Sequence, residues 1–259
     1  EEYIKAGKGK IEKTKYAHNT WNDETHTGTS VIKEEVLVLD AMAMKDICYL
    51  MPCPKSPHGC DVDPTGEYIV GSGKLAALIP VFSFDKMVKA IGKKDYEGDY
   101  EGIPVLKYNS VLHGEVQKPG LGPLHTEFDG KGNAYTTFFV SSEVVKWDIK
   151  TLKVLDRVPT YYSVGHLMIP GGDSKKPFGK YLVAYNKITK DRYLPTGPEL
   201  TQSAQLYDIS GDKMKLLLDF PTIGEPHYAQ AAPADLIRNN GQLKIYDIKK
   251  NNHPRVAKG

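Results

Sequence analysis

The sequence predicts an all-β protein of the β-propeller class, with about four to five blades of a seven-bladed ring. The 259 residues include 24 glycines and 17 prolines, a content that is typical of many turns between short elements. A strand ending in a bulky apolar residue and then Asp also recurs five times, at Asp40, Asp85, Asp148, Asp208 and Asp247. Such spacing is typical of four-stranded blades of about 40 to 50 residues, some enlarged by loops.

Hairpin patterns recur between these aspartates. Residues 59–63 and 67–70 are expected to pair across a Pro-Thr-Gly turn, and residues 126–129 and 133–139 across a Gly-Lys-Gly turn. A third, enlarged hairpin is expected over residues 167–185, with a polar loop at its tip. Helical periodicity is brief and falls at 1–6, 85–91 and 233–237. The helices are therefore expected to lie between strands and not to form the core.

Composition excludes several classes of protein. Hydrophobic residues make up 40% of the chain, including 16 Tyr and 7 Phe, so the chain has enough apolar surface to fold without disulfides. The 34 basic and 32 acidic residues are balanced, which argues against a nucleic-acid partner. The richest apolar run, residues 36–44, is broken by Asp40 and is too short for a membrane span.

The three cysteines, Cys48, Cys53 and Cys60, match neither a redox pair nor a zinc motif. We expect them to be small core residues. The sequence begins at Glu1 with no signal peptide, so we expect that processing or truncation has removed an earlier segment.

Four of the eight histidines share one position, just before or at the start of a predicted first strand. They are His58, His125, His166 and His227. First strands line the central channel of a propeller, so these side chains are expected to converge from separate blades. Imidazole without paired carboxylates favours copper or zinc over calcium. His18, His26, His113 and His253 lack this pattern, and ordinary half-buried histidines remain the alternative interpretation for each member of the set.

Other chemistries have less support in the sequence. There is no Gly-x-Ser-x-Gly elbow and no P-loop, and residues 71–74 resemble a phosphate loop only superficially. Asp61, Asp63 and Asp129 stand near turns, where Asp is common, and we prefer that interpretation to a calcium site.

At these positions the sequence resembles the nitrous oxide reductase family. The similar segments, in order, are SPHG at 56–59, DPTG at 63–66, GLGPLHT at 120–126, FDGKGNAYTT at 128–137, KDRYLP at 190–195 and EPH at 225–227. The resemblance covers nearly the whole chain. It implies that residues 1–259 are a partial propeller domain and that the family's C-terminal cupredoxin domain, which holds a dinuclear copper centre, is absent.

The resemblance further implies a copper oxidoreductase of denitrification, which reduces N2O by two electrons to N2 and water. The family holds a sulfide-bridged tetranuclear copper cluster with seven histidines. His58, His125, His166 and His227 match four of them, and the other three belong to a segment before Glu1. This chain alone is therefore expected to be inactive. A periplasmic location, a homodimer and a cytochrome c or cupredoxin electron donor are also implied.

Three further residues take roles only by this resemblance. Lys187 matches a family lysine near the cluster and is expected to stabilise or protonate the oxygen that leaves N2O. A calcium site is implied at Lys187, Gln202 and Ser56, although the last two replace a Glu and an Asn of the family.

Two alternatives remain open. A non-catalytic propeller that binds a partner on one rim predicts that the four histidines diverge. A propeller hydrolase with a central calcium needs converging carboxylates, which the sequence does not make evident.

Overall fold

The computed structural model describes residues 5–7, 9–18, 30–39, 41–187, 202–222 and 226–233. The chain divides into two compact units. The first contains residues 1–52 and 89–110, and the second contains residues 53–88 and 111–259. The predicted helices at 1–6 and 233–237 and the fifth repeat at Asp247 lie wholly or mostly outside the described residues.

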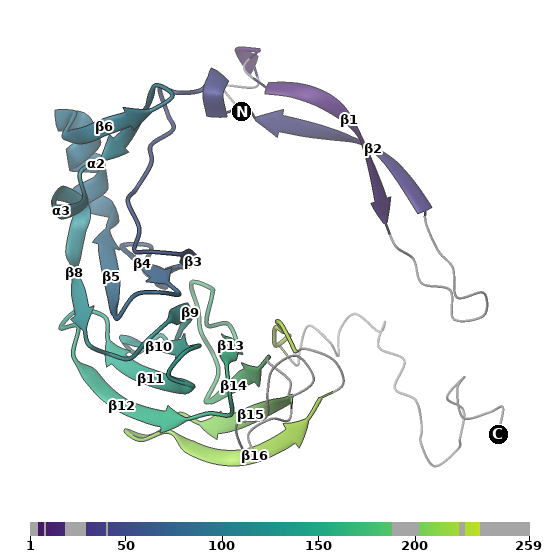
Figure 1. Ribbon diagram of the computed structural model, residues 1–259, viewed down its shortest axis with the longest axis vertical. Coiled ribbons are helices and arrows are strands. Elements are labelled where there is room, and N and C mark those ends of the chain that lie inside the picture. Colours follow the sequence, from purple (N-terminus) through teal and green to yellow (C-terminus); the bar gives the residue numbers. More distant parts are fainter. Residues whose placement is uncertain are drawn as a thin grey trace. The chain divides into compact units, whose positions relative to one another are not determined.

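The second unit contains three four-stranded antiparallel sheets, which are blades of a partial β-propeller (Figure 1). Blade 1 consists of β3 (Pro57–Val62), β4 (Tyr68–Gly73), β5 (Leu78–Ser83) and β8 (Leu112–Gln117). Blade 2 consists of β9 (Pro123–Phe128), β10 (Asn133–Phe138), β11 (Glu143–Asp148) and β12 (Val154–Pro159). Blade 3 consists of β13 (Val164–Met168), β14 (Tyr181–Asn186), β15 (Ser203–Asp208) and β16 (Lys215–Pro221). All three predicted hairpins are confirmed as the first two strands of a blade.

The recurring Asp marks the end of the third strand in each blade. Asp148 ends β11, Asp208 ends β15, and Asp85 follows β5 by two residues. The carboxylate of Asp148 accepts the backbone N–H of Thr151 at 2.7 Å, and that of Asp208 accepts Ser210 N–H at 2.8 Å. The repeat is therefore a turn signal, because Asp satisfies backbone donors where the chain leaves the strand.

The first unit departs from the blade pattern. Its strands form two two-stranded sheets, β1 (Gly9–His18) with β2 (Ser30–Leu39) and β6 (Tyr96–Tyr100) with β7 (Ile103–Leu106). The predicted repeat ending at Asp40 is thus a two-stranded ribbon and not a blade. The helix predicted over 85–91 is confirmed as α2 (Phe84–Lys93), while η1 (Ala41–Ala43) and α3 (Tyr108–Val111) are short. The long interval between Asp85 and Asp148 is explained by the segment inserted between β5 and β8.

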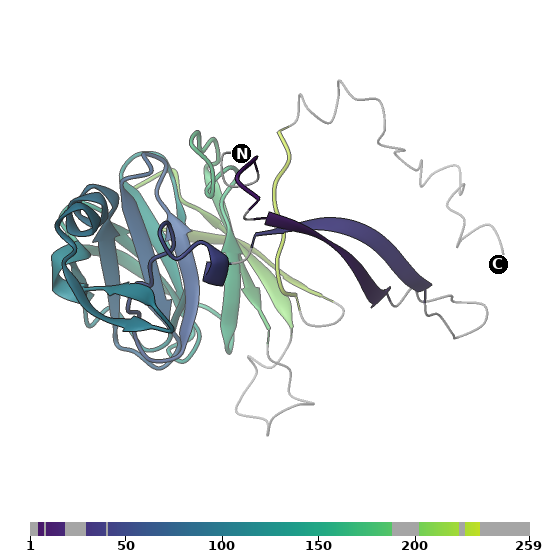
Figure 2. The same cartoon turned by 90° about the horizontal axis from the view of Figure 1, so that it is seen from above.

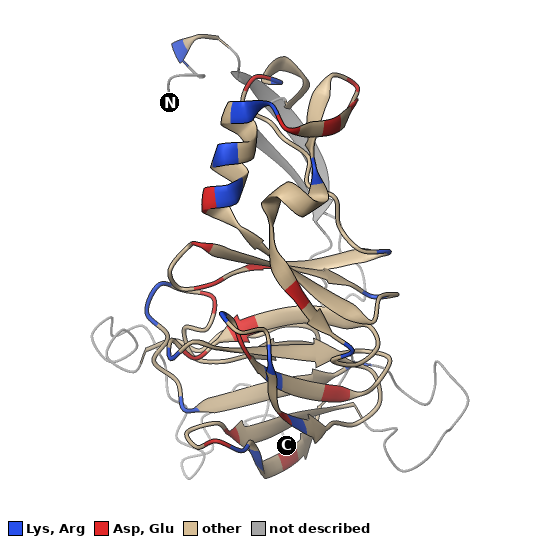
Figure 3. Cartoon of the chain, turned by 90° about the vertical axis from the view of Figure 1, so that its left-hand side faces the viewer, with Lys and Arg blue, Asp and Glu red and all other residues tan. Residues whose placement is uncertain are grey.

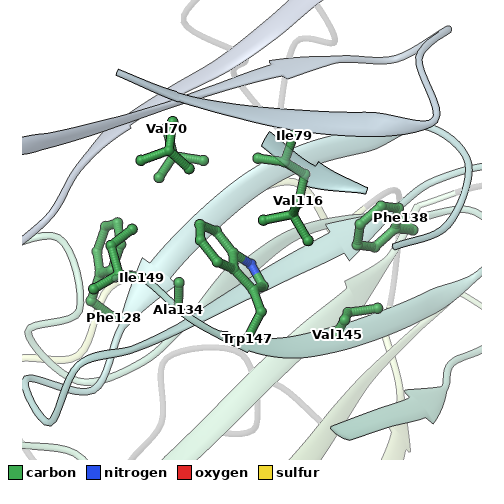
Figure 4. Packing of buried hydrophobic residues seen from close by; sticks show 10 residues of the cluster. Val70, Ile79, Val116, Phe128, Ala134, Phe138, Val145, Trp147 and Ile149 are labelled. Carbon is green, nitrogen blue, oxygen red and sulfur yellow. The ribbon is translucent and has the colours of Figure 1, made fainter. Parts of the chain in front are cut away.

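One core cluster joins blades 1 and 2 (Figure 4). Alternate residues of the inner strands point into it, as period-two side-chain alternation requires. On β10 these are Ala134 and Phe138, and on β11 they are Val145 and Trp147. Trp147 is fully buried, and its Nε1 donates to Thr136 Oγ1 at 2.9 Å. The indole therefore fills the core without leaving its polar atom unpaired.

The intervening residues of the same strands face blade 3. Tyr135 and Val144 belong to a second core cluster with residues of β13, β14 and β15, including Leu167, Leu182 and Tyr207. The middle blade is consequently apolar on both faces and packs face to face with its two neighbours, and Figure 2 shows the twisted strands of the second unit. Face-to-face stacking of sheets is the packing expected of a propeller.

We expect Trp147→Phe to lower the free energy of unfolding by about 1–3 kcal/mol, because the smaller ring leaves a cavity and removes one buried hydrogen bond. Urea denaturation monitored by circular dichroism measures this change. Phe178→Leu is the control, since Phe178 is 52% exposed, and a change within about 0.5 kcal/mol is expected there. A loss at Trp147 no larger than that of the control would contradict the packing described.

Surface properties follow the composition. Basic and acidic residues are interspersed along the ribbon in Figure 3. No helix among the described residues has the length and apolar character needed to cross a bilayer.

The expected core role of the cysteines is wrong: Cys48 is half-buried, and Cys53 and Cys60 are exposed. Cys60 lines a cavity beside β3, β9 and β13 and is therefore not packed in a core.

Candidate metal centre

Three of the four histidines lie on the first strand of successive blades. His58 is the second residue of β3, and His125 and His166 are the third residues of β9 and β13. Prolines start β3 and β9, where a missing N–H does not interrupt pairing. His227 lies in the described segment 226–233 that follows blade 3. The strands β3, β9 and β13 are neighbours in space, so the three blades present their histidines to one region.

The four imidazole rings form a continuous row. His58 meets His125 edge to face with ring centroids 4.8 Å apart, and His125 stacks on His166 at 3.6 Å with an interplanar angle of 19°. His166 lies 4.7 Å from His227. Divergent histidines, which a non-catalytic binding module predicts, are therefore not observed.

Two glycines beside the histidines allow the close approach of the strands. A Cβ on Gly59 would lie 1.9 Å from the backbone oxygen of Leu124, the residue before His125. A Cβ on Gly165, the residue before His166, would lie 1.9 Å from Cδ of Lys187. Any larger residue would have to displace the backbone before His125 or the side chain of Lys187, because real Cβ contacts are not this short.

Burial keeps the central rings neutral. Desolvation, reinforced by His166, lowers the pKa of His125 to about 3. Desolvation and then the charge of Lys187 lower the pKa of His166 to about 4 and shift the pKa of His58 in the same direction. At neutral pH these rings therefore offer lone pairs, the form in which histidine binds metals.

Two ring nitrogens at the centre of the row have no protein partner. Nε2 of His125 and Nδ1 of His166 are buried and accept or donate no hydrogen bond among the described residues. Buried polar atoms are nearly always satisfied, so such atoms indicate a function that the protein alone does not fulfil. The stacked arrangement itself is not that of a metal-bound set: no three His, Cys, Asp or Glu side chains in the described part of the chain surround a common point.

The other predicted site residues lie at different distances from this row. Nζ of Lys187 is 3.4 Å from Nε2 of His227, within reach of the ring. Gln202 accepts Thr222 N–H through its backbone oxygen, and Ser56 has a φ of 59° and accepts Lys74 N–H, both at 2.9 Å. These backbone contacts leave the calcium assignment a prediction.

Of the other histidines, His113 makes its contacts away from the row. His113 is on β8, and its Nε2 is 3.1 Å from the backbone oxygen of Lys150. His18 ends β1, and His26 and His253 lie outside the described residues.

Sequence reasoning missed three carboxylates beside the row. Asp61, Glu127 and Asp173 line a cavity of about 250 Å³ together with the rings of His125 and His166. Burial raises the pKa of Asp61 to about 7 and that of Glu127 to about 8, partly offset by a backbone N–H bonded to each.

The preferred interpretation of all these aspartates as turn residues is right for two of them and wrong for Asp61. Asp63 and Asp129 bind the N–H groups of their own turns, whereas Asp61 binds another blade. The available signal was position: Asp61 and Glu127 each stand two residues before a turn Asp.

Asp61 is expected to make stability depend on pH in the metal-free protein. Its carboxyl stays protonated to about pH 7 in the folded state but ionises near 4 when unfolded, so folding takes up a proton between these values. The free energy of unfolding is therefore highest at low pH and falls as the pH rises, by up to about 1.4 kcal/mol per pH unit. Urea denaturation from pH 4 to 8 should show a shallower slope in Asp61→Asn than in the wild type, because Glu127, whose pKa is also raised, contributes equally to both proteins. Identical slopes in both proteins would contradict the buried position.

Comparisons with known proteins identify relatives of this chain. A family model described as "Nitrous oxide reductase propeller repeat" matches residues 157–227, a segment that includes His166, Lys187 and His227. The nitrous-oxide reductase of Stutzerimonas stutzeri is 39% identical over 207 residues, which are 76% of this chain and 30% of that protein. The chain is homologous to nitrous-oxide reductases.

Further relatives agree with this homology. The nitrous-oxide reductase of Pseudomonas fluorescens is 36% identical over 80% of this chain and 31% of its own length. The nitrous-oxide reductase of Ralstonia nicotianae is 39% identical over 67% of this chain and 27% of its own length. This chain therefore spans about 30% of the length of the nitrous-oxide reductases it matches. Among solved structures, Kuenenia stuttgartiensis hydrazine synthase gives a TM-score of 0.44 at 14% identity over 64% of this chain and 37% of its own, too low for any conclusion.

Proposed function

We propose that this chain is part of a nitrous-oxide reductase and that His58, His125, His166 and His227 hold copper. The observation that carries the proposal is the row of four rings from three blades and the following segment, with centroid spacings of 3.6 to 4.8 Å. The homology to nitrous-oxide reductases supports the same assignment.

The residues present fit copper. Imidazole nitrogen binds both Cu(I) and Cu(II), and neutral rings add no charge to a multinuclear centre. The unpartnered nitrogens of His125 and His166 are donors that a metal would satisfy. Because the rings come from different blades, the sheets fix their positions with little reorganisation.

The reaction consumes two electrons and two protons with N2O and yields N2 and water. When bound, reduced copper would supply the electrons to N2O. Lys187 would hold one of the two protons at Nζ beside His227 and give it to the oxygen as the N–O bond breaks, and solvent would supply the second. Because the imidazole rings of the row would be neutral, the ammonium of Lys187 would be the positively charged group beside them.

Further parts of the proposal rest on the family alone. Residues 1–259 would form part of a seven-bladed propeller, with the remaining cluster histidines and the cupredoxin domain with its dinuclear copper contributed by other segments. The cluster would be tetranuclear and sulfide-bridged, and this chain alone would be inactive. The complete protein would be a periplasmic homodimer that receives electrons from cytochrome c or a cupredoxin. Calcium would bind at Lys187, Gln202 and Ser56.

Conversion of isotopically labelled N2O by the complete, copper-loaded protein tests the proposal. With a reduced viologen as donor, mass spectrometry should detect labelled N2 in proportion to bound copper. Copper-loaded protein that binds its metal yet forms no N2 above the metal-free sample would overturn the proposed activity.

A further inference from the structure

Each junction along the histidine row is closed by a carboxylate. At the junction of blades 1 and 2, Asp61 Oδ2 on β3 accepts the backbone N–H of Thr126 at 2.8 Å. Thr126 directly follows His125. The bond therefore ties the strand that bears His58 to the backbone that carries the next ring.

The junction of blades 2 and 3 repeats the arrangement. Glu127 Oε2 on β9 accepts the backbone N–H of Ile169, just beyond β13, which bears His166. The backbone folds around this carboxylate, since a Cβ on Gly172 would lie 2.5 Å from Oε2. The N–H of Phe128 also donates to Gly172 O at 3.1 Å. Glu127 thus sits in a cradle that blade 3 supplies.

The third junction uses side chains instead of backbone. Asp173 Oδ2 accepts Gln230 Nε2 at 2.6 Å, and Tyr228 Oη lies 3.4 Å from the same oxygen. Tyr228 directly follows His227, and its ring packs against that of His166 with centroids 5.2 Å apart. All three carboxylates line the same cavity as His125 and His166.

The first two carboxylates occupy equivalent places in their blades. Asp61 and Glu127 each precede the turn Asp by two residues, and each follows the same register shift of its first strand, between Pro57 and Cys60 in β3 and between Pro123 and Thr126 in β9. His58 and His125 are the first and the second residue inside this shift, which accounts for the extra residue between histidine and carboxylate in blade 1. The carboxylate position is therefore preserved between blades although the local sequences differ.

We propose that Asp61 and Glu127 are positioning residues, which set the spacing of the imidazoles by bonding one blade to the backbone of the next. The inference rests on the proposed copper function for its role. Outer partners of metal ligands typically change metal affinity by about 10- to 100-fold when removed. A buried backbone N–H without an acceptor is unfavourable, so loss of the carboxylate will favour a backbone shift that restores a hydrogen bond. The strand that carries the histidine will move with that shift.

Paired variants separate positioning from general stability. Asp61→Ala and Glu127→Ala remove the acceptor, whereas Asp61→Asn and Glu127→Gln keep an oxygen that can accept the same N–H. The matched control is Asp156→Ala. The Asp156 carboxylate accepts Met214 N–H at 2.7 Å and so joins blades 2 and 3, but it lies on β12 and away from the histidine strands.

The experiment titrates Cu(II) into the complete metal-free protein and records affinity together with the electron paramagnetic resonance spectrum. We expect each alanine variant to bind copper about 10- to 100-fold more weakly, with an altered nitrogen hyperfine pattern. The Asn and Gln variants should stay within about 3-fold of wild type, and Asp156→Ala should lower the melting temperature without changing the spectrum. Unchanged spectra and affinities in both alanine variants would overturn the inference.

A second measurement keeps this test separate from the proposed function. If the wild type binds no copper, the proposed function fails, and crystal structures of the metal-free proteins decide the positioning role. We expect the His58–His125 spacing to change in Asp61→Ala and the His125–His166 spacing to change in Glu127→Ala. Spacings that match the wild type would overturn it.

Discussion

His166→Ala is expected to lower the copper affinity of the complete protein by about 100-fold or more and to abolish N2O reduction. His166 is the centre of the row, since its ring contacts those of His125, His227 and Tyr228. Removing it separates the remaining donors into two groups. Metal analysis after dialysis against a weak chelator measures the loss, and labelled N2 formation measures the activity.

His113→Ala is the matched control for this change. His113 is also a histidine on a blade strand, but it contacts Tyr68 and the backbone of Lys150 instead of the row. We expect full copper content and activity in this variant. Equal copper content in His166→Ala and His113→Ala would contradict the assignment of the row.

Lys187→Met is expected to lower kcat by about 100- to 10,000-fold while copper content stays at the wild-type level. The change removes the ammonium but keeps a side chain of similar length against Gly165. Lys187→Arg should retain part of the activity, because it restores the charge without a readily released proton. Steady-state rates of N2 formation, normalised to bound copper, make the comparison.

Lys74→Met is the control for the loss of a positive charge. The Lys74 charge also acts on His58, but its Nζ lies 3.9 Å from the centroid of the Phe139 ring and is held there. We expect kcat within about 3-fold of wild type in this variant, as for a screened surface charge. Similar losses in both variants would show that Lys187 acts only through its field and not as a proton donor.

The sequence predicted the repeat and the position of the histidines because both depend on local patterns. Period-two alternation, turn residues and the Asp at the end of the third strand can be recognised from neighbouring residues. The structure confirms the blades 1 to 3 that these patterns predict. Histidines at equivalent places in repeats must lie near one another once the blades stack. Their convergence follows from the repeat alone.

The carboxylates could not be predicted in the same way. Whether Asp61 bonds its own turn, as Asp63 does, or the N–H of Thr126 depends on the register between blades. The sequence of a single strand does not specify that register, and the local irregularity in pairing recurs in the first strand of all three blades. The first predicted repeat is wrong because β1 and β2 form a two-stranded sheet with each other instead of a blade.

Copper-edge anomalous diffraction from crystals of the complete, copper-loaded protein tests the central claim most directly. The account predicts anomalous peaks about 2.0–2.1 Å from ring nitrogens of His58, His125, His166 and His227, as expected for metal–imidazole bonds. Copper peaks elsewhere, with these four rings still stacked on one another, would contradict it.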